Sequence, residues 1–159
     1  MMRIFKKINF VQSFIIAVKI INLKLWQMNI IVSLLLVSVY NYSFWHDIFR
    51  IIHPSTISSY AFIFSIFMLV TLIVNLLLTL FCTKYSYKFI YIVIFLGSSA
   101  CLYFTNEYNV LIDSDMIQNL VETDASEAFD FINGKMFLYL LVMGLLPIAI
   151  MLKTPIRFE

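Results

Sequence analysis

The chain has 159 residues, of which 62% are hydrophobic and 13% are charged, with a formal net charge of +2 at pH 7. A soluble globular domain is about 45–50% apolar and about 25% charged, so this composition excludes an ordinary soluble domain and indicates a membrane protein. Apolar residues run almost without interruption through Ile30 to Val39 and Ala61 to Leu80. Strands of a membrane β-barrel would alternate apolar and polar residues instead. The sequence therefore predicts an all-α fold, a polytopic helical bundle in a membrane.

Residues 1–24 form the first segment in chain order. The stretch from Phe10 to Ile21 is apolar, but Lys19 interrupts it and Lys24 follows it. No small-x-small cleavage site follows the basic start, which disfavours a cleavable signal peptide. We expect an amphipathic helix in the membrane interface on the cytoplasmic side, because aliphatic residues recur three and four residues apart. These residues are Ile4, Ile8, Val11, Ile15 and Val18.

Four later stretches approach the ~20 apolar residues that a helix needs to cross a bilayer. They are residues 25–45, 60–82, 89–105 and 136–152, within a membrane domain of residues 25–159.

Two polar or helix-breaking residues lie inside these predicted spans. Asn75 is an amide deep in the second span, and we expect it to bond to a neighbouring helix or a backbone carbonyl. Pro147 lies in the fourth span, where it removes one backbone hydrogen bond and predicts a kink.

The charges predict the orientation of the chain. With a cytoplasmic N-terminus, nine of the 11 Lys and Arg residues lie on the cytoplasmic side, and eight of the nine Asp and Glu residues lie outside. This distribution agrees with the positive-inside rule. The basic residues border apolar stretches and do not form one patch, so we expect no nucleic-acid partner.

Cysteine and histidine positions give no strong sign of a disulfide or a metal site. Cys82 and Cys101 lie near opposite ends of one pair of apolar segments, so we expect both to be packing residues. His46 and His53 lie near Asp47 in the first outer loop, residues 43–59. A metal site there is a weak possibility because no third local ligand accompanies the histidines, and interfacial loop histidines are the favoured interpretation.

The second outer segment carries the most informative pattern. Capping residues predict an amphipathic helix over about residues 114–132. On it, Asn119, Thr123 and Glu127 are spaced at i, i+4 and i+8, so they share one face. A carboxylate can pair with an ammonium, while an amide and a hydroxyl can donate toward phosphate or ester oxygens, as a zwitterionic head group requires. Composition alone favours the alternative of a solvated polar face.

A resemblance to a known family changes this balance. The stretches from Tyr108 to Glu127 and from Leu138 to Pro147 resemble the amino-terminal membrane domain of bacterial phosphoethanolamine transferases. That family includes the lipid A modifying enzymes and the mobile colistin resistance proteins. The similarity is specific around Asp113 to Glu127, and it extends more loosely from about Leu25 to Phe158.

The resemblance implies a multi-pass protein of the bacterial inner membrane, with residues 105–135 in the periplasm. In the family, a periplasmic domain with a threonine nucleophile and zinc ligands moves phosphoethanolamine from phosphatidylethanolamine to lipid A. Asn119, Thr123 and Glu127 match the positions that hold the phosphoethanolamine part of the substrate, so the resemblance makes them substrate-binding residues. Phosphatidylethanolamine and lipid A are the implied lipid partners.

The sequence also departs from the family. The family has five spans before its catalytic domain, whereas this sequence stops at Glu159, after the fourth predicted span. We therefore expect no catalytic residue, metal ligand or cofactor in this chain, and an inactive isolated chain unless a separately encoded catalytic domain completes it.

Two other functions stay open. The alternative is a standalone small membrane protein that binds lipid or a partner without catalysis. A transporter or channel subunit is the weakest hypothesis, because the predicted spans lack the ionisable residues that mark an ion path.

Overall fold

The computed structural model describes residues 23–108 and 133–157. The predicted interfacial helix in residues 1–24 and the predicted helix at 114–132 therefore lie outside the described residues, apart from Leu23 and Lys24. The elements in chain order are β1 (Leu23–Lys24), α2 (Leu25–Ser38), α3 (Tyr42–Ile52), α4 (Ile57–Phe81), α5 (Tyr87–Tyr108), α8 (Gly134–Tyr139), the π-helix η1 (Leu140–Leu145), α9 (Leu146–Lys153) and β2 (Ile156–Arg157).

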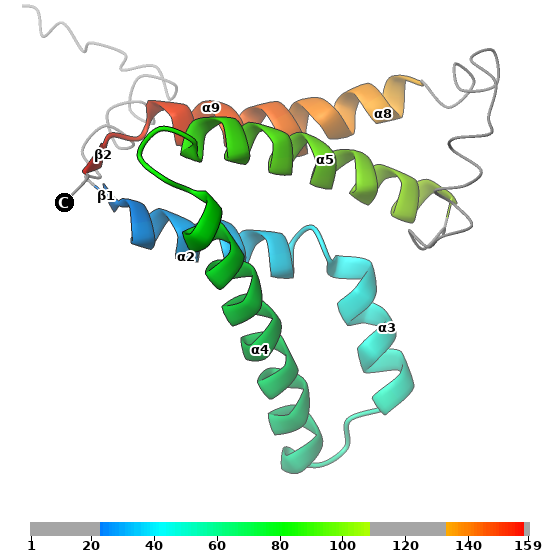
Figure 1. Cartoon of the computed structure of the whole chain (residues 1–159). Coiled ribbons are helices and arrows are strands. Elements are labelled where there is room, and N and C mark those ends of the chain that lie inside the picture. The colour runs from blue at the N-terminus through cyan, green and yellow to red at the C-terminus, as the bar shows by residue number, and fades with distance from the viewer. Residues whose placement is uncertain (1–22, 109–132, 158–159) are drawn as a thin grey trace, which may run out of the picture.

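Figure 1 shows α5 running beside the continuous helix formed by α8, η1 and α9, while α4 and α3 point away from them. Among the described residues, three helices are long and apolar enough to cross a membrane: Ile57–Phe81, Tyr87–Glu107 and Gly134–Lys153. The helices predicted at 60–82, 89–105 and 136–152 are confirmed.

The helix predicted over residues 25–45 is wrong as a single continuous element. Helix α2 ends at Ser38, and α3 is bent from it by 56°. Two side chains donate hydrogen bonds to carbonyl groups in the last turn of α2. Asn41 Nδ2 donates to Leu36 O at 2.9 Å, and Trp45 Nε1 donates to Val37 O at 2.6 Å. Because these side chains satisfy carbonyl groups that a further helical turn would otherwise satisfy, the helix can end at Ser38 and the chain can turn. Only as a bent pair do α2 and α3 offer a fourth span.

The prediction of a first outer loop over residues 43–59 is also wrong for most of its length. Residues 43–59 were expected to be a loop, but α3 occupies 42–52 and leaves only residues 53–56 as the connection to α4. Helix α4 then begins after Thr56, whose hydroxyl oxygen accepts from Ser59 N at 3.4 Å. A Ser or Thr side chain at this position satisfies one of the unpaired N–H groups at the start of a helix.

The core lies between α2, α5 and the last helix. Helix α2 buries Met28, Val32 and Leu36, one turn apart, against Tyr91 and Phe95 of α5 and residues of α9. Helix α4 is different, since the residues it buries are Ile63, Thr71 and Leu78, while most of its large apolar side chains are exposed. Lipid tails are as apolar as these side chains, so this exposure fits a helix that faces the bilayer.

The buried amide that joins the helices is Asn29, not Asn75. Asn29 is 1% exposed, accepts from Tyr91 Oη at 2.6 Å and donates to Thr79 Oγ1 at 3.4 Å. The prediction that the Asn75 amide bonds to a neighbouring helix or a backbone carbonyl is wrong for its nitrogen, because Nδ2 is buried without a partner among the described residues. Asn29 lies near the start of its apolar stretch. The position of a polar residue within an apolar stretch therefore did not predict which amide would join the helices.

Pro147 disturbs the last helix by changing its winding. The six residues before Leu146 form the π-helix η1, and Pro147 follows in the first turn of α9. Proline has no N–H to donate to the carbonyl of Met143, four residues earlier. The hydroxyl of Tyr40 donates to that carbonyl instead. The predicted local defect is therefore present as a π-helix, which is a known way to absorb such an interruption.

A two-residue parallel pair was not expected from an all-α sequence. Leu23 pairs with Ile156 and Lys24 pairs with Arg157, so β1 and β2 join the start of α2 to the residues after α9.

The cysteines are both free, as expected. The packing role predicted for both is confirmed for Cys82, which is buried, and wrong for Cys101, which is exposed.

Candidate functional site

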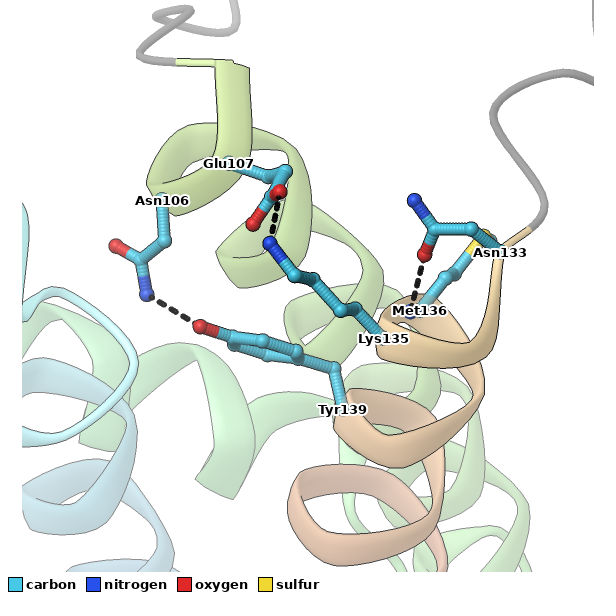
Figure 2. Close-up of polar contacts among 6 residues, drawn as sticks. All are labelled: Asn106, Glu107, Asn133, Lys135, Met136 and Tyr139. Atoms are coloured by element: carbon cyan, nitrogen blue, oxygen red, sulfur yellow. Dashed lines mark hydrogen bonds and ion pairs between the residues drawn. The ribbon is translucent and has the colours of Figure 1, made fainter.

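The predicted substrate-binding residues lie in a segment whose ends are described but whose interior is not. Asn119, Thr123 and Glu127 lie between the end of α5 and the start of α8, outside the described residues. Their shared helical face stays a prediction. The structure does describe a polar cluster at the two points where this segment joins the bundle, and Figure 2 shows these side chains approaching one another from α5 and α8.

An ion pair joins the two attachment points. Lys135 Nζ of α8 lies 2.5 Å from Glu107 Oε1 of α5. The Lys135 side chain is 65% exposed and that of Glu107 is 31% exposed, so water and salt weaken the attraction. Its main consequence is geometric, because it connects two residues on either side of the undescribed segment.

Asn106 connects three helices beside this ion pair. Its Oδ1 accepts from Ser43 Oγ of α3 at 2.8 Å, and its Nδ2 donates to Tyr139 Oη of α8 at 3.4 Å. The Tyr139 ring packs edge-on against Tyr103, with the ring centroids 5.7 Å apart. Tyr103 is fully buried, so it fixes the direction from which Tyr139 reaches Asn106. The amide of Asn106 thus orders the end of α5 against both neighbours.

The start of α8 is fixed by its own cap. Asn133 Oδ1 accepts from Met136 N at 3.0 Å, which satisfies one of the free N–H groups of the first turn. This cap places Lys135 within the first turn, facing Glu107 (Figure 2).

A mainly apolar groove adjoins the polar cluster. Its volume is about 520 Å³, and its polar side chains include Asn106 and Tyr139. The residues lining it are Ser38, Val39, Tyr42, Leu102, Asn106, Leu138, Tyr139, Val142 and Met143. A groove with an apolar body and a few polar groups at one end is the usual form of a site for an amphipathic ligand. In a membrane protein, a lipid has this amphipathic character.

Sequence reasoning missed the residues of this cluster. Ser43 and Asn106 are 63 residues apart, and Asn106 and Tyr139 are 33 residues apart. No short spacing connects them, and each looks like an ordinary polar residue at the end of an apolar stretch. Glu107 and Lys135 were counted only as charges on the outer side.

The described residues hold no cluster of metal ligands. Within 23–108 and 133–157, no group of three His, Cys, Asp or Glu side chains could hold a metal ion. His46 Nδ1 lies 3.7 Å from Asp47 Oδ1, and both side chains are largely exposed. His53 ends α3 in the left-handed conformation, with φ of 43°.

The lipid-facing helices define the chain as a helical membrane protein. The family model for the phosphoethanolamine transferases EptA and EptB matches residues 70–159, more than half of the chain, and the chain belongs to this family. The matched range includes α5, the last helix and the segment between them. The resemblance identified from the sequence is thereby confirmed.

Two curated relatives support the same assignment. The chain is 32% identical over 66 residues to phosphoethanolamine transferase EptA of Helicobacter pylori, a match that covers 42% of the chain and 13% of that protein. It is 27% identical over 67 residues to phosphatidylethanolamine transferase Mcr-2 of Escherichia coli, covering 42% of the chain and 12% of that protein. The chain thus matches only about an eighth of each relative's length. No solved structure gives a significant match.

Proposed function

We propose that this chain is the membrane-anchoring and lipid-docking part of a phosphoethanolamine transferase that moves phosphoethanolamine from phosphatidylethanolamine to lipid A. The observation that carries this proposal is the family match over residues 70–159, which spans the segment between α5 and α8. The printed functions of the two relatives, both transferases, agree with it.

Asn119, Thr123 and Glu127 are the proposed head-group ligands. Glu127 would pair with the ammonium of phosphoethanolamine, and Asn119 and Thr123 would donate to its phosphate oxygens. The structure supports this position indirectly, because the Glu107–Lys135 ion pair brings the two ends of their segment together beside the apolar groove. A lipid whose head group met this segment would then have an apolar surface for its acyl chains close by.

The orientation we propose is an N-terminus in the cytoplasm and residues 105–135 in the periplasm of a bacterial inner membrane. Lysine and arginine residues border one end of the bundle, where Figure 1 shows β1, β2, the end of α9 and the turn between α4 and α5, whereas Glu107 belongs to the last turn of α5, at the opposite end of that helix. The basic residues at the first end are Lys24, Lys84, Lys88, Lys153 and Arg157. The positive-inside rule assigns that basic end to the cytoplasm.

We further propose that this chain docks lipid without catalysing transfer by itself. Zinc-dependent transfer needs a ligand set, and the described residues bring no such set together. The nucleophile and zinc site would come from a catalytic domain outside the 159 residues, either continuous with them or separately encoded.

The docking residues can be tested in the transferase that contains this segment. Asn119→Ala and Glu127→Ala should each lower phosphoethanolamine-modified lipid A, measured by mass spectrometry, by at least about tenfold. Immunoblots of washed membranes should show the same amount of protein for each variant as for wild type. Glu122→Ala is the matched control, since it removes a carboxylate from the same segment but off the predicted face. Normal lipid A modification by the first two variants would overturn the site assignment.

The catalytic assignment needs a separate experiment. Expression of residues 1–159 alone in a host without its own transferase should leave lipid A unmodified. If the short chain modified lipid A, the docking-only role would be wrong. If it left lipid A unchanged but altered the abundance of another membrane protein, a standalone interaction module would replace our proposal.

A further inference from the structure

One face of the last helix changes from charged to apolar in three steps. Lys135 and Tyr139 are four residues apart in α8, so they lie on the same side of it, about one turn from each other. Figure 2 shows both side chains reaching residues of α5. Tyr139 lines the apolar groove, and Val142 and Met143 continue its wall through the next turn. A cation, a hydroxyl and an apolar surface therefore follow one another along this face.

Helix α5 presents the same order from its end inward. Glu107 pairs with Lys135 at the level of the charges. Asn106 Nδ2 donates to Tyr139 Oη at the next level. Leu102, about one turn before Asn106, lines the groove. A phospholipid has the same three levels, because its charged head group is joined through ester groups to its acyl chains.

The middle level can donate hydrogen bonds to a ligand. Asn106 Nδ2 carries two hydrogens, and its bond to Tyr139 uses one of them. The Tyr139 hydroxyl accepts that bond and can itself donate one. Tyr42 brings a third donor group to the same groove from the start of α3. Ester carbonyl oxygens accept hydrogen bonds, so this level suits the glycerol ester region of a lipid.

The charged level contains one ammonium and one carboxylate. Lys135 Nζ and Glu107 Oε1 are 2.5 Å apart, and both side chains are partly exposed. Such a pair contributes little to stability, so a ligand that brings both charges can take its place without a large loss. Lys135 can pair with a phosphate. Glu107 can accept one of the three N–H groups of a primary ammonium and leaves two for other acceptors.

We propose that Lys135 and Glu107 select the head group of phosphatidylethanolamine, whose acyl chain lies in the apolar groove. This site rests on the lipid-docking function proposed above and adds residues to it. The addition is needed because the three head-group ligands proposed there include no cation for the phosphate; they are Asn119, Thr123 and Glu127.

Charge complementarity decides which phospholipid fits. Phosphatidylglycerol would meet Lys135 with its phosphate, but it has no ammonium and would leave Glu107 beside a second negative charge. Phosphatidylcholine carries a positive charge, but its trimethylammonium group has no N–H to donate to Glu107. Phosphatidylethanolamine satisfies both side chains.

The ion pair has a simpler explanation, which is that it only holds the ends of α5 and α8 together. In that case, changes at Glu107 or Lys135 would alter stability and leave the choice of lipid unchanged. Lipid selectivity therefore separates the two explanations. Asp47 and Arg50 supply matched control charges, because both are exposed in α3 and neither lines the groove.

The test is native mass spectrometry of the purified 159-residue chain in detergent, titrated with each of the three phospholipids carrying the same acyl chains. Wild type should bind phosphatidylethanolamine about fivefold more tightly than the other two. Lys135→Gln should weaken phosphatidylethanolamine binding about fivefold. Glu107→Gln should abolish the preference over phosphatidylglycerol. Arg50→Gln and Asp47→Asn should stay within about twofold of wild type. A wild type without the preference, or equal losses in all four variants, would overturn the proposal.

A conservative variant separates the charge from the fold. Lys135→Arg keeps a cation at the same position and should bind phosphatidylethanolamine within about twofold of wild type. Failure of this rescue would count against the proposal. Equal loss of all three lipids in Lys135→Gln, together with a lower thermal midpoint, would assign the ion pair a structural role alone.

The acyl-chain level needs its own variant. Val142→Trp fills the groove and should weaken phosphatidylethanolamine and phosphatidylglycerol by a similar factor, whereas Val93→Trp, at an exposed position of α5 outside the groove, should leave both unchanged. Soluble phosphorylethanolamine should bind much more weakly than the lipid. If it bound as tightly, or if Val142→Trp had no effect, the groove would not hold an acyl chain.

The outcome is independent of the transfer experiment. Unchanged lipid selectivity in the Lys135 and Glu107 variants, with loss of transfer in Glu127→Ala, would reject this site and keep the proposed function. Loss of selectivity with normal transfer in Glu127→Ala would instead keep this lipid site and reject the earlier docking residues.

Discussion

The hydroxyl of Tyr40 donates a hydrogen bond to the backbone carbonyl of Met143, the carbonyl that residue 147 would pair with in a regular α-helix if it were not proline. Tyr40 follows α2, and Met143 lies within η1, 103 residues later. A side chain from the turn between α2 and α3 thus donates to the backbone of the last helix, where lipid could not do so.

Removing this hydroxyl should destabilise the bundle. We expect Tyr40→Phe to lower the free energy of unfolding by about 1 kcal/mol, the typical size of a hydrogen bond between membrane helices. The measurement is unfolding in mixed micelles by titration with a denaturing detergent. Tyr60→Phe is the control, because Tyr60 is 54% exposed on α4. In a Pro147→Ala background the loss should shrink, since residue 147 then has an N–H for Met143. An undiminished loss there would contradict this explanation.

Gly144 permits the close contact between η1 and α5. A Cβ atom at Gly144 would lie 3.0 Å from Ser99 Oγ and 3.2 Å from Leu96 Cδ2. We expect Gly144→Leu to destabilise the same micelle preparation by about 1–3 kcal/mol, because the contact has no room for a side chain. Gly97→Leu, on the same pair of helices, should have little effect because nothing lies within 4 Å of its Cβ position. Equal losses at the two glycines would rule out this steric account.

The amides of Asn29 and Asn75 should respond differently to the same substitution. Asn29→Leu removes the partner of Tyr91 Oη and should destabilise the chain by about 1–2 kcal/mol. Asn75→Leu removes a buried Nδ2 that has no partner in the described residues, so it should leave stability unchanged or raise it. Unfolding midpoints of the two variants, measured together, check the order. A larger loss at Asn75 would mean that its amide has a role that the contacts do not show.

The contribution of the Glu107–Lys135 ion pair to thermal stability should depend on the salt concentration. Lys135→Glu places two carboxylates together and should lower the thermal midpoint at low ionic strength, and Glu107→Lys in the same chain should restore it. The difference should fade in about 1 M salt, where charges are screened within about 3 Å. Arg50→Glu makes the same change of charge at an exposed position in the last turn of α3 and should have a smaller effect, limited to the loss of a cation at a helix C-terminus. A salt-independent effect would point to packing instead.

The sequence predicted the long helices because membrane crossing is a local property. The apolar stretches that become α4, α5 and the last helix contain the information in their own length and composition. The break after α2 was not visible in this way. It depends on Asn41 and Trp45 donating back to carbonyls of α2, and a hydropathy pattern does not register such bonds.

The polar contacts were harder to predict for a related reason. The Ser43, Asn106 and Tyr139 side chains come from three helices, and only the packed bundle brings them together. Asn119, Thr123 and Glu127 were found because they repeat along one short segment and resemble a family pattern. Their shared helical face therefore stays a prediction, while the polar cluster at the ends of their segment is an observation of the structure.

The β1–β2 pair also constrains the order of assembly during synthesis. Leu23 leaves the ribosome long before Ile156, so this pair cannot close until the last helix has been made and inserted. Until then β1, at the start of α2, has no strand to pair with. Unpaired strand edges of this kind are open to other partners during synthesis. The cavity lined by Lys24, Lys84 and Arg157 would therefore be the last part of the described bundle to be completed.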